Sequence, residues 1–227
     1  MDTRTRKPRS DKGRILPTDR DYDILRWIGE QYVVRFDHLQ WLLGRERGYS
    51  VSVRTAQGII DRWKRLHFVE QQKYLFKEPN YIWLTTPGLR FVELPYSYWE
   101  PRITTVAHPH DVNRVLIYLT TNGHYTMLKW RSERAIIWYE HRRDHYPDAE
   151  VDIASTETGQ RQVVAIEVER TQKSAVRIDA ILRELAHTYT TIWYFVADGA
   201  WTGIEKGIAR LPDEMRGRFR MKSLEVL

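Results

Sequence analysis

The chain has 227 residues, of which 42% are hydrophobic and 12% aromatic, enough to fold as one large or two small domains. It contains no cysteine, which excludes disulfides, thiolate zinc sites and cysteine nucleophiles and favours an intracellular protein. No apolar run reaches the roughly 18 residues that a bilayer span needs, and no signal peptide opens the chain. We therefore expect a cytoplasmic protein that does not enter a membrane.

Positive charge gathers at the start of the chain. The formal net charge is +6, and residues 1–14 carry six basic side chains without an aliphatic anchor. Such a segment cannot offset the entropy lost on ordering, so we expect a disordered basic arm when the protein is free. Two interpretations stay open: a tail that only aids solubility, or an arm that neutralises phosphates.

Residues 15–94 show the pattern helix, helix, helix, hairpin, helix. Apolar spacing predicts a first helix in 17–32, and a second in 35–44 that stops at Gly44. A third helix is expected across 50–66, with Ser50 or Ser52 as N-cap. The residues expected to face inward from that third helix are Val53, Ala56, Ile60, Trp63 and Leu66. Two strands follow in 68–76 and 80–88, and a last helix runs from Pro87 towards Leu94.

Three helices followed by a β-hairpin are typical of a winged helix-turn-helix. With the apolar stripe of the third helix packed, its polar residues are left for solvent, and they are of the types that contact phosphates and base edges in a major groove. We therefore predict that this helix binds double-stranded DNA. The candidate DNA-binding residues are Arg54, Gln57, Arg62, Lys64 and Arg65. A merely solvated polar face and a protein-docking module remain as alternatives.

Three prolines interrupt residues 95–109, which we interpret as a linker to a second domain at 110–227. Here the predicted order is α-β-β-β-α-β, then a helix and a strand. The first helix begins near His110, with strands in 125–130, 149–155 and 161–170; residues 133–139 could extend the first strand. A helix in 173–189 is expected to turn Val176, Ala180, Ile181 and Leu185 inward. A buried strand at 191–198 precedes a short helix near 203–211 and a terminal strand from 220.

Two carboxylates should meet in this second domain. Asp148 stands at the start of one central strand and Glu167 lies inside the next, and the hairpin between them brings the two together. Glu169 shares the face of Glu167, because side chains two apart on a strand point the same way. Like charges on a core strand are costly unless something offsets them. Carboxylate oxygens suit Mg²⁺ or Mn²⁺, which can activate water and stabilise a phosphodiester transition state. A structural alternative is that the glutamates pair with Arg170, Lys173 or Arg177.

Four short motifs stand in order behind the predicted winged helix, and together they resemble the motif order of known DNA-processing proteins. The motifs are "HPHDVNRV", "WRSE", "YPDAEVDI" and "AIEVERTQKS". The second domain is similar to the PD-(D/E)XK, or restriction-endonuclease-like, superfamily. The whole arrangement resembles the replication-relaxation family of plasmid and mobile-element proteins, over most of residues 15–200. The resemblance implies an α+β, or α/β, two-domain protein that acts in replication or DNA relaxation.

Carried over by position, the resemblance makes Asp148 and Glu167 metal ligands, assisted by the carbonyl of Val168. This chain has Glu169 where the superfamily has its catalytic lysine. Three explanations stay open: Glu169 acts as a base or further ligand, Lys173 reaches back to supply the positive charge, or the site is degenerate. Glu133 is a candidate additional acid.

The histidines give no persuasive zinc spacing. His108 and Asn113 belong to the family-like pattern, and we expect a helix-capping or interdomain contact from them. The leading hypothesis is thus a DNA-binding protein of a plasmid or mobile element that nicks or cuts DNA with Mg²⁺ or Mn²⁺. Its expected partners are DNA and either a second copy or other replication or mobilisation proteins. The alternatives are a non-catalytic regulator or assembly factor and, more weakly, a subunit of a transposition endonuclease.

Overall fold

The computed structural model describes residues 16–140 and 144–227 as a mixed α+β fold with a three-stranded and a five-stranded sheet. The basic arm expected at 1–14 lies outside the described residues. Within the described ranges, no helix combines the length and apolar character that a membrane crossing requires.

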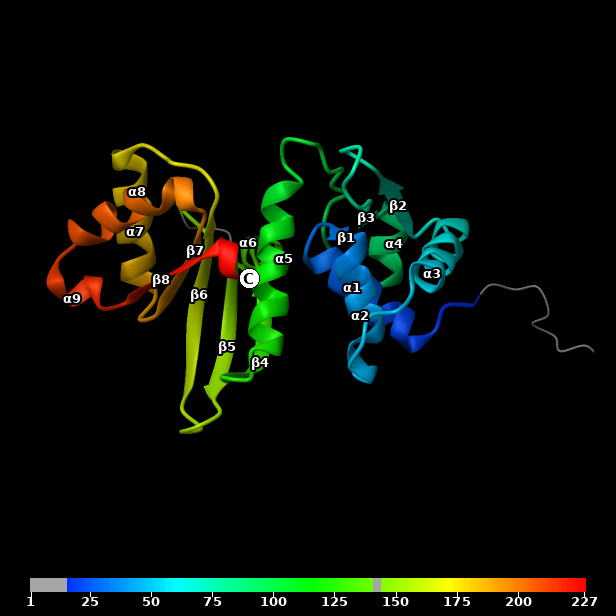
Figure 1. The fold of residues 1–227 in the computed structure, drawn as a ribbon, viewed down its shortest axis with the longest axis horizontal. Helices are drawn as coiled ribbons and strands as arrows, with labels where there is room; N and C mark the ends of the chain where they lie inside the picture. The colour runs from blue at the N-terminus through cyan, green and yellow to red at the C-terminus, as the bar shows by residue number, and fades with distance from the viewer. Residues whose placement is uncertain (1–15, 141–143) are drawn as a thin grey trace, which may run out of the picture.

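The N-terminal half contains a short antiparallel sheet in the order β1-β3-β2, with helices packed around it (Figure 1). Its elements are α1 (Asp19–Glu30), β1 (Val34–Arg35), α2 (Phe36–Gly44), the 3-10 helix η1 (Arg45–Arg47), α3 (Val53–Arg65), β2 (Val69–Gln72), β3 (Tyr81–Leu84) and α4 (Thr86–Phe91). The predicted helices and hairpin of this half are therefore present.

Local capping explains where two of these helices begin. Thr18 forms a reciprocal capping box with Asp21 at the start of α1. Ser52, rather than Ser50, caps α3 by accepting a hydrogen bond from the backbone N–H of Thr55. Ala56, Ile60 and Trp63 are buried as expected, but Val53 is 63% exposed. That expectation was wrong because Val53 is the first helical residue and projects beyond the packed stripe.

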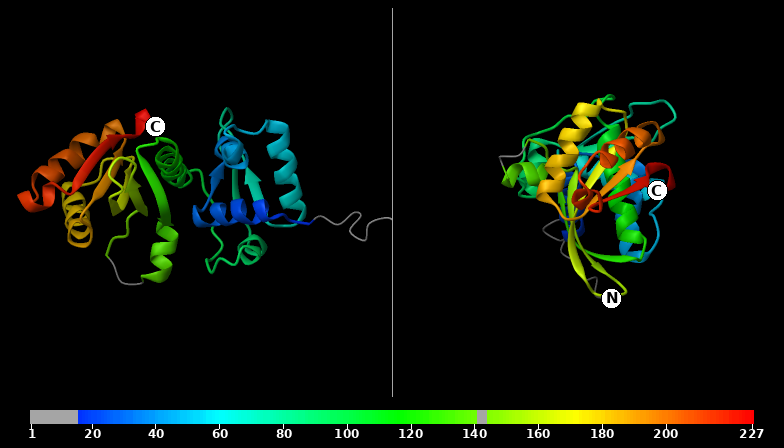
Figure 2. Two further views of the ribbon diagram at one scale, coloured as in Figure 1. Left: turned by 90° about the horizontal axis from the view of Figure 1, so that it is seen from below. Right: turned by 90° about the vertical axis from the view of Figure 1, so that its left-hand side faces the viewer.

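The C-terminal half is built on one sheet in the order β4-β5-β6-β7-β8. Strands β4, β5 and β6 are antiparallel, and β6, β7 and β8 run parallel. Its elements are α5 (Ala107–Thr121), β4 (Tyr125–Ser132), α6 (Glu133–Tyr139), β5 (Ala149–Ser155), β6 (Arg161–Glu169), α7 (Ala175–Thr188), β7 (Ile192–Val196), α8 (Asp198–Ala209), α9 (Asp213–Arg216), β8 (Phe219–Ser223) and the 3-10 helix η2 (Leu224–Val226). Helices α7 and α8 cover one face, and α5 lies on the other, towards the N-terminal half (Figure 1, Figure 2).

One segment and one helix face of this half differ from the expectation. Residues 133–139 form helix α6 instead of extending the strand, because the Ser132 side chain accepts from the N–H of Ala135 and caps a new helix. Val176 and Ala180 face solvent, since α7 turns Ile178, Ile181, Leu182 and Leu185 inward.

Two helices also begin earlier than expected. Helix α8 begins at Asp198 and not near residue 203. Helix α5 begins at Ala107, three residues before the predicted domain start, and holds a proline in its first turn, where a backbone N–H has no acceptor within the helix.

The segment expected as a linker is packed between the halves. Tyr96 and Val106 are buried in hydrophobic clusters of the N-terminal half. Arg134, from α6, is 8% exposed and donates to the carbonyls of Gly29, at 2.9 Å, and Ser97. Its guanidinium also lies 4.8 and 4.7 Å from the ring centres of Tyr32 and Tyr96. These contacts join α6 of the C-terminal half to the N-terminal half.

Candidate functional site

The hairpin of β5 and β6 brings the predicted carboxylates together. Register pairs Ala149 with Ile166, so Asp148, just before β5, lies beside the end of β6. One Asp148 carboxylate oxygen, Oδ2, accepts from the backbone N–H of Val168 at 2.6 Å. The backbone N–H of Glu133 donates to the Asp148 carbonyl at 2.9 Å. Asp148, Glu167 and Glu133 therefore form one acidic cluster, which we call by that name below.

Two histidines offset the charge of this cluster. His108 Nε2 lies 2.7 Å from Asp148 Oδ1, and His145 Nε2 lies 2.8 Å from Glu167 Oε1. Burial opposes protonation of both rings, yet the Asp148 carboxylate raises the pKa of His108 to about 9, and the hydrogen bond to Glu167 raises the pKa of His145. Each carboxylate thus faces a ring whose protonated form it stabilises.

Burial also favours the neutral form of two carboxyl groups in the cluster. Burial raises the pKa of the Glu167 carboxyl, and the nearby Asp148 charge adds to that rise. Burial and Asp148 likewise raise the pKa of Glu133. Carboxyl groups perturbed by burial and by one another are typical of functional sites, although structural networks also show them.

Glu169 and Lys173 form a separate pair at the end of β6. Glu169 is buried, and the Lys173 ammonium reaches back from the residue before the α7 N-cap to its carboxylate. The ion pair of Lys173 is therefore with the carboxylate of Glu169, and not with that of Asp148 or Glu167. Arg170 pairs with Asp111 at 2.8 Å.

The side chains as placed do not form a metal site. Both oxygens of Asp148 are engaged, by His108 and by the N–H of Val168, and Glu167 is engaged by His145. Among the residues that the structure describes, no group of three or more His, Asp or Glu is arranged to hold an ion. A hard divalent cation would need those oxygens free.

Sequence reasoning missed the role of the histidines. It assigned His108 an interdomain or capping contact, whereas that contact belongs to Asn113, whose amide donates to the carbonyl of Val33 at 2.7 Å. One signal was available for His145, which stands three residues before Asp148 in the same loop. No comparable local signal exists for His108, which lies 40 residues from its partner.

The predicted DNA-facing residues of α3 divide into two groups. Arg54, Lys64 and Arg65 are exposed on its outer face, and Gln57 is half-buried and donates to Asp61 at 2.8 Å. Arg62 turns inward and forms an ion pair with the fully buried Asp21. The same Asp21 oxygen accepts from the indole N–H of Trp63 at 3.0 Å. Arg62 therefore joins α3 to α1.

Comparisons with protein-family models, curated proteins and solved structures find no match for this chain.

Proposed function

We propose that the protein binds double-stranded DNA through a winged helix-turn-helix formed by α1 to β3. The observation that carries the proposal is the outer face of α3. Arg54, Gln57, Asp61, Lys64 and Arg65 follow one another at helical spacing on that face, and the three basic members are exposed. A helix of this width and charge fits a major groove, with arginine and lysine on phosphates and guanine edges.

Gly58 supports the same use of α3. Glycine in a helix interior costs about 1 kcal/mol relative to alanine, and packing does not explain this one. Gly58 is exposed, and a side chain there would meet nothing within 4 Å. Gly58 lies one helical turn after Arg54, at the edge of the basic face, and its missing side chain permits close approach of the helix to a phosphate backbone or a base edge.

The loop between β2 and β3 supplies a second contact, the wing. Lys73 and Lys77 are exposed in it, and Phe76 is 88% exposed at its tip. The Lys73 ammonium lies 5.8 Å from the centre of the Phe76 ring. Cations beside an exposed ring suit a phosphate backbone and the sugar edges of a groove.

The proposal is tested with a fluorescent duplex titrated by anisotropy at fixed salt. Arg54→Gln, Lys64→Gln and Arg65→Gln should each weaken binding several-fold, because each removes a phosphate or base contact. Arg183→Gln, an exposed arginine on α7, is the matched control and should bind as the parent does. An equal loss of affinity in all four variants would indicate that binding depends on the overall charge of the protein and not on α3. Unchanged affinity in all four would exclude α3 as the interface.

A second candidate function is DNA cleavage, and a specific observation favours it. The element order α5-β4-α6-β5-β6-α7-β7, with three antiparallel strands and then a parallel one, resembles a PD-(D/E)XK nuclease-like core apart from the inserted α6, and it brings Asp148, just before β5, beside Glu167 of β6. Metal-dependent cleavage would require His108 and His145 to leave the carboxylates. The resemblance to the replication-relaxation family extends this candidate to plasmid or mobile-element DNA.

Cleavage is tested with supercoiled plasmid and Mg²⁺ or Mn²⁺, with EDTA as the control. Asp148→Asn and Glu167→Gln keep the size of the side chains and should abolish any relaxed or linear product. If the parent yields none while duplex binding persists, the protein is a non-catalytic regulator or assembly factor with a nuclease-like domain.

A further inference from the structure

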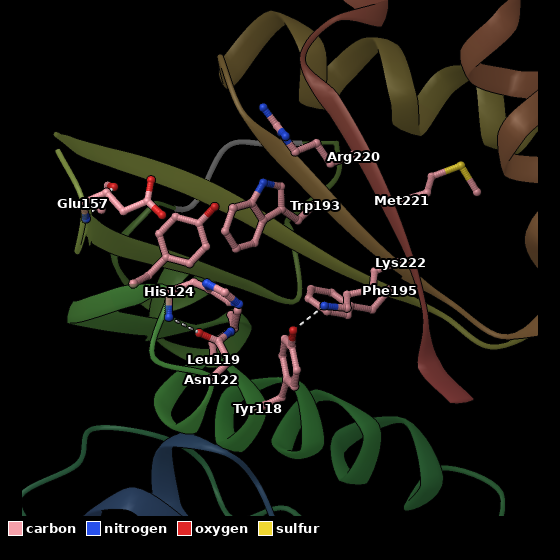
Figure 3. A pocket seen from close by; sticks show the side chains of 12 residues that line it. Tyr118, Leu119, Asn122, His124, Glu157, Trp193, Phe195, Arg220, Met221 and Lys222 are labelled. Carbon is pink, nitrogen blue, oxygen red and sulfur yellow. Dashed lines mark hydrogen bonds between the residues drawn. The ribbon is translucent and has the colours of Figure 1, made fainter. Parts of the chain in front are cut away.

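A cavity of about 680 Å³ opens on the α5 side of the five-stranded sheet, and none of the described residues that line it belongs to the acidic cluster (Figure 3). It lies between the C-terminal end of α5 and strands β7 and β8. Helix α5 carries His108 in its first turn and Tyr118 near its end, and β5 runs from beside Asp148 to Ser155, which lines the cavity. The cavity is thus a second site, and its use is independent of the proposed DNA binding.

The strand register builds an aromatic and cationic wall. Trp193 pairs with Arg220 and Phe195 with Lys222 across β7 and β8. Side chains two apart on a strand share a face, so both pairs line the cavity. In Figure 3, Met221 points away from this group, as the alternation requires. Two adjacent strands therefore place two rings beside two cations.

The cations of this wall are not neutralised by carboxylates. Arg220 is exposed and makes no ion pair in the described part of the chain. The Lys222 ammonium donates to the Tyr118 hydroxyl, which is uncharged, and lies 4.2 Å from the centre of that ring (Figure 3). Glu157, exposed in the β5–β6 turn, is the single acidic side chain among the described residues lining the cavity. An anion is therefore the complementary ligand for the β8 side.

The other side of the cavity offers the flat faces of two aromatic rings and an indole N–H as a hydrogen-bond donor. The rings of Tyr125 and Trp193 lie with centres 5.2 Å apart. Trp193 is 9% exposed, and its indole N–H has no hydrogen-bond partner among the residues that the structure describes. A buried donor without an acceptor is uncommon and is satisfied when a ligand supplies one.

We propose that this cavity binds a nucleotide, with the base against the rings of Tyr125 and Trp193 and the phosphate on Arg220 and Lys222. Aromatic faces accept any base, and a cavity of this volume is in the usual range for small-molecule sites. The nucleotide has two sources, a free mononucleotide or the phosphorylated end of a DNA strand. Both present the same base and phosphate.

The test is titration of the ¹⁵N-labelled full chain, followed through the indole N–H signals in NMR spectra. The probes are dAMP, deoxyadenosine, inorganic phosphate, and a short single strand with or without a 5′-phosphate. Trp193→Phe assigns the indole signal. We expect saturable shifts of the Trp193 signal with dAMP, and at least about 10-fold weaker binding in Arg220→Gln and in Lys222→Gln, since each removes a charge-assisted hydrogen bond.

The probes separate the two sources. Saturation by dAMP identifies free nucleotide as sufficient, and saturation by the 5′-phosphorylated strand alone identifies a strand end. Lys206→Gln, an exposed lysine on α8, is the matched control and should bind as the parent does. The proposal is overturned if deoxyadenosine or inorganic phosphate binds as tightly as dAMP, if no probe saturates, or if both β8 variants bind unchanged. Because the charge variants alter exposed or half-buried ends of side chains, they test the site even if Trp193→Phe does not fold.

Discussion

The stacked histidines between the two halves should make the protein sensitive to acid. His38 of α2 and His110 of α5 lie with ring centres 4.7 Å apart. Burial lowers the pKa of His38 to about 4 and that of His110 to about 3; their proximity lowers the pKa of His110 further. The Nδ1 atoms of both rings are buried and have no hydrogen-bond partner within residues 16–140 and 144–227. The folded protein therefore keeps both rings neutral.

Protonation of these two histidines is linked to unfolding, so acid lowers the stability of the fold. The unfolded chain takes up these protons near pH 6.5, whereas the folded protein does so only below about pH 4, so stability falls as the pH drops below 6.5. At about pH 5 the shift of His110 corresponds to roughly 2 kcal/mol, taking about 1.4 kcal/mol per pKa unit over the interval below 6.5. This is a large part of a typical stability of about 5–15 kcal/mol.

The assay is urea unfolding at about pH 7 and pH 5 for the parent and His110→Phe, which stacks on His38 and needs no hydrogen bond. The variant should lose about 2 kcal/mol less than the parent between the two pH values. Contributions from the acidic cluster are common to both proteins and cancel in this difference. His187→Phe, on the exposed side of α7, is the control for loss of a histidine. Equal acid losses in parent and His110→Phe would refute the reasoning.

Two further predictions concern buried polar groups. Arg134→Met should destabilise the fold by roughly 2–4 kcal/mol in urea titration, because it leaves the Gly29 and Ser97 carbonyls without their donor and removes two ring contacts; a change below about 0.5 kcal/mol would show that the halves do not depend on it. Asp21→Ala should cost about 3 kcal/mol, since it strands the Trp63 indole N–H and the Arg62 guanidinium. Removing Arg62 as well, in a double-mutant cycle, should recover part of that loss, and strict additivity would contradict the pairing.

Elements with a clear apolar period could be predicted from the chain, and those fixed by a single local contact were ambiguous. Helix α3 is long enough for its apolar period to be decisive, whereas strand β7 is a continuous apolar run of β-branched and aromatic residues. Residues 133–139 combine a short apolar run with a strand directly before it, so only the Ser132 cap distinguishes helix from strand. Short apolar runs of this kind are compatible with both states.

The site was less predictable than the fold because its pairings cross long stretches of sequence. The hairpin made the meeting of Asp148 and Glu167 foreseeable. The pairing of Arg62 with Asp21 was not, because helical periodicity places Arg62 on the polar side and carries no information about a carboxylate on another helix. The contact of His108 with Asp148 joins residues on α5 and before β5 and depends on how α5 packs on the sheet.

The measurement that tests the central claim most directly is the salt dependence of duplex binding. The dissociation constant of the parent and of Arg54→Gln/Lys64→Gln/Arg65→Gln would be followed over stepped salt concentrations. DNA binding through α3 predicts weaker binding by the triple variant, and a log–log slope smaller by about one for each phosphate contact removed, up to about three. A triple variant with the affinity and slope of the parent would contradict the account.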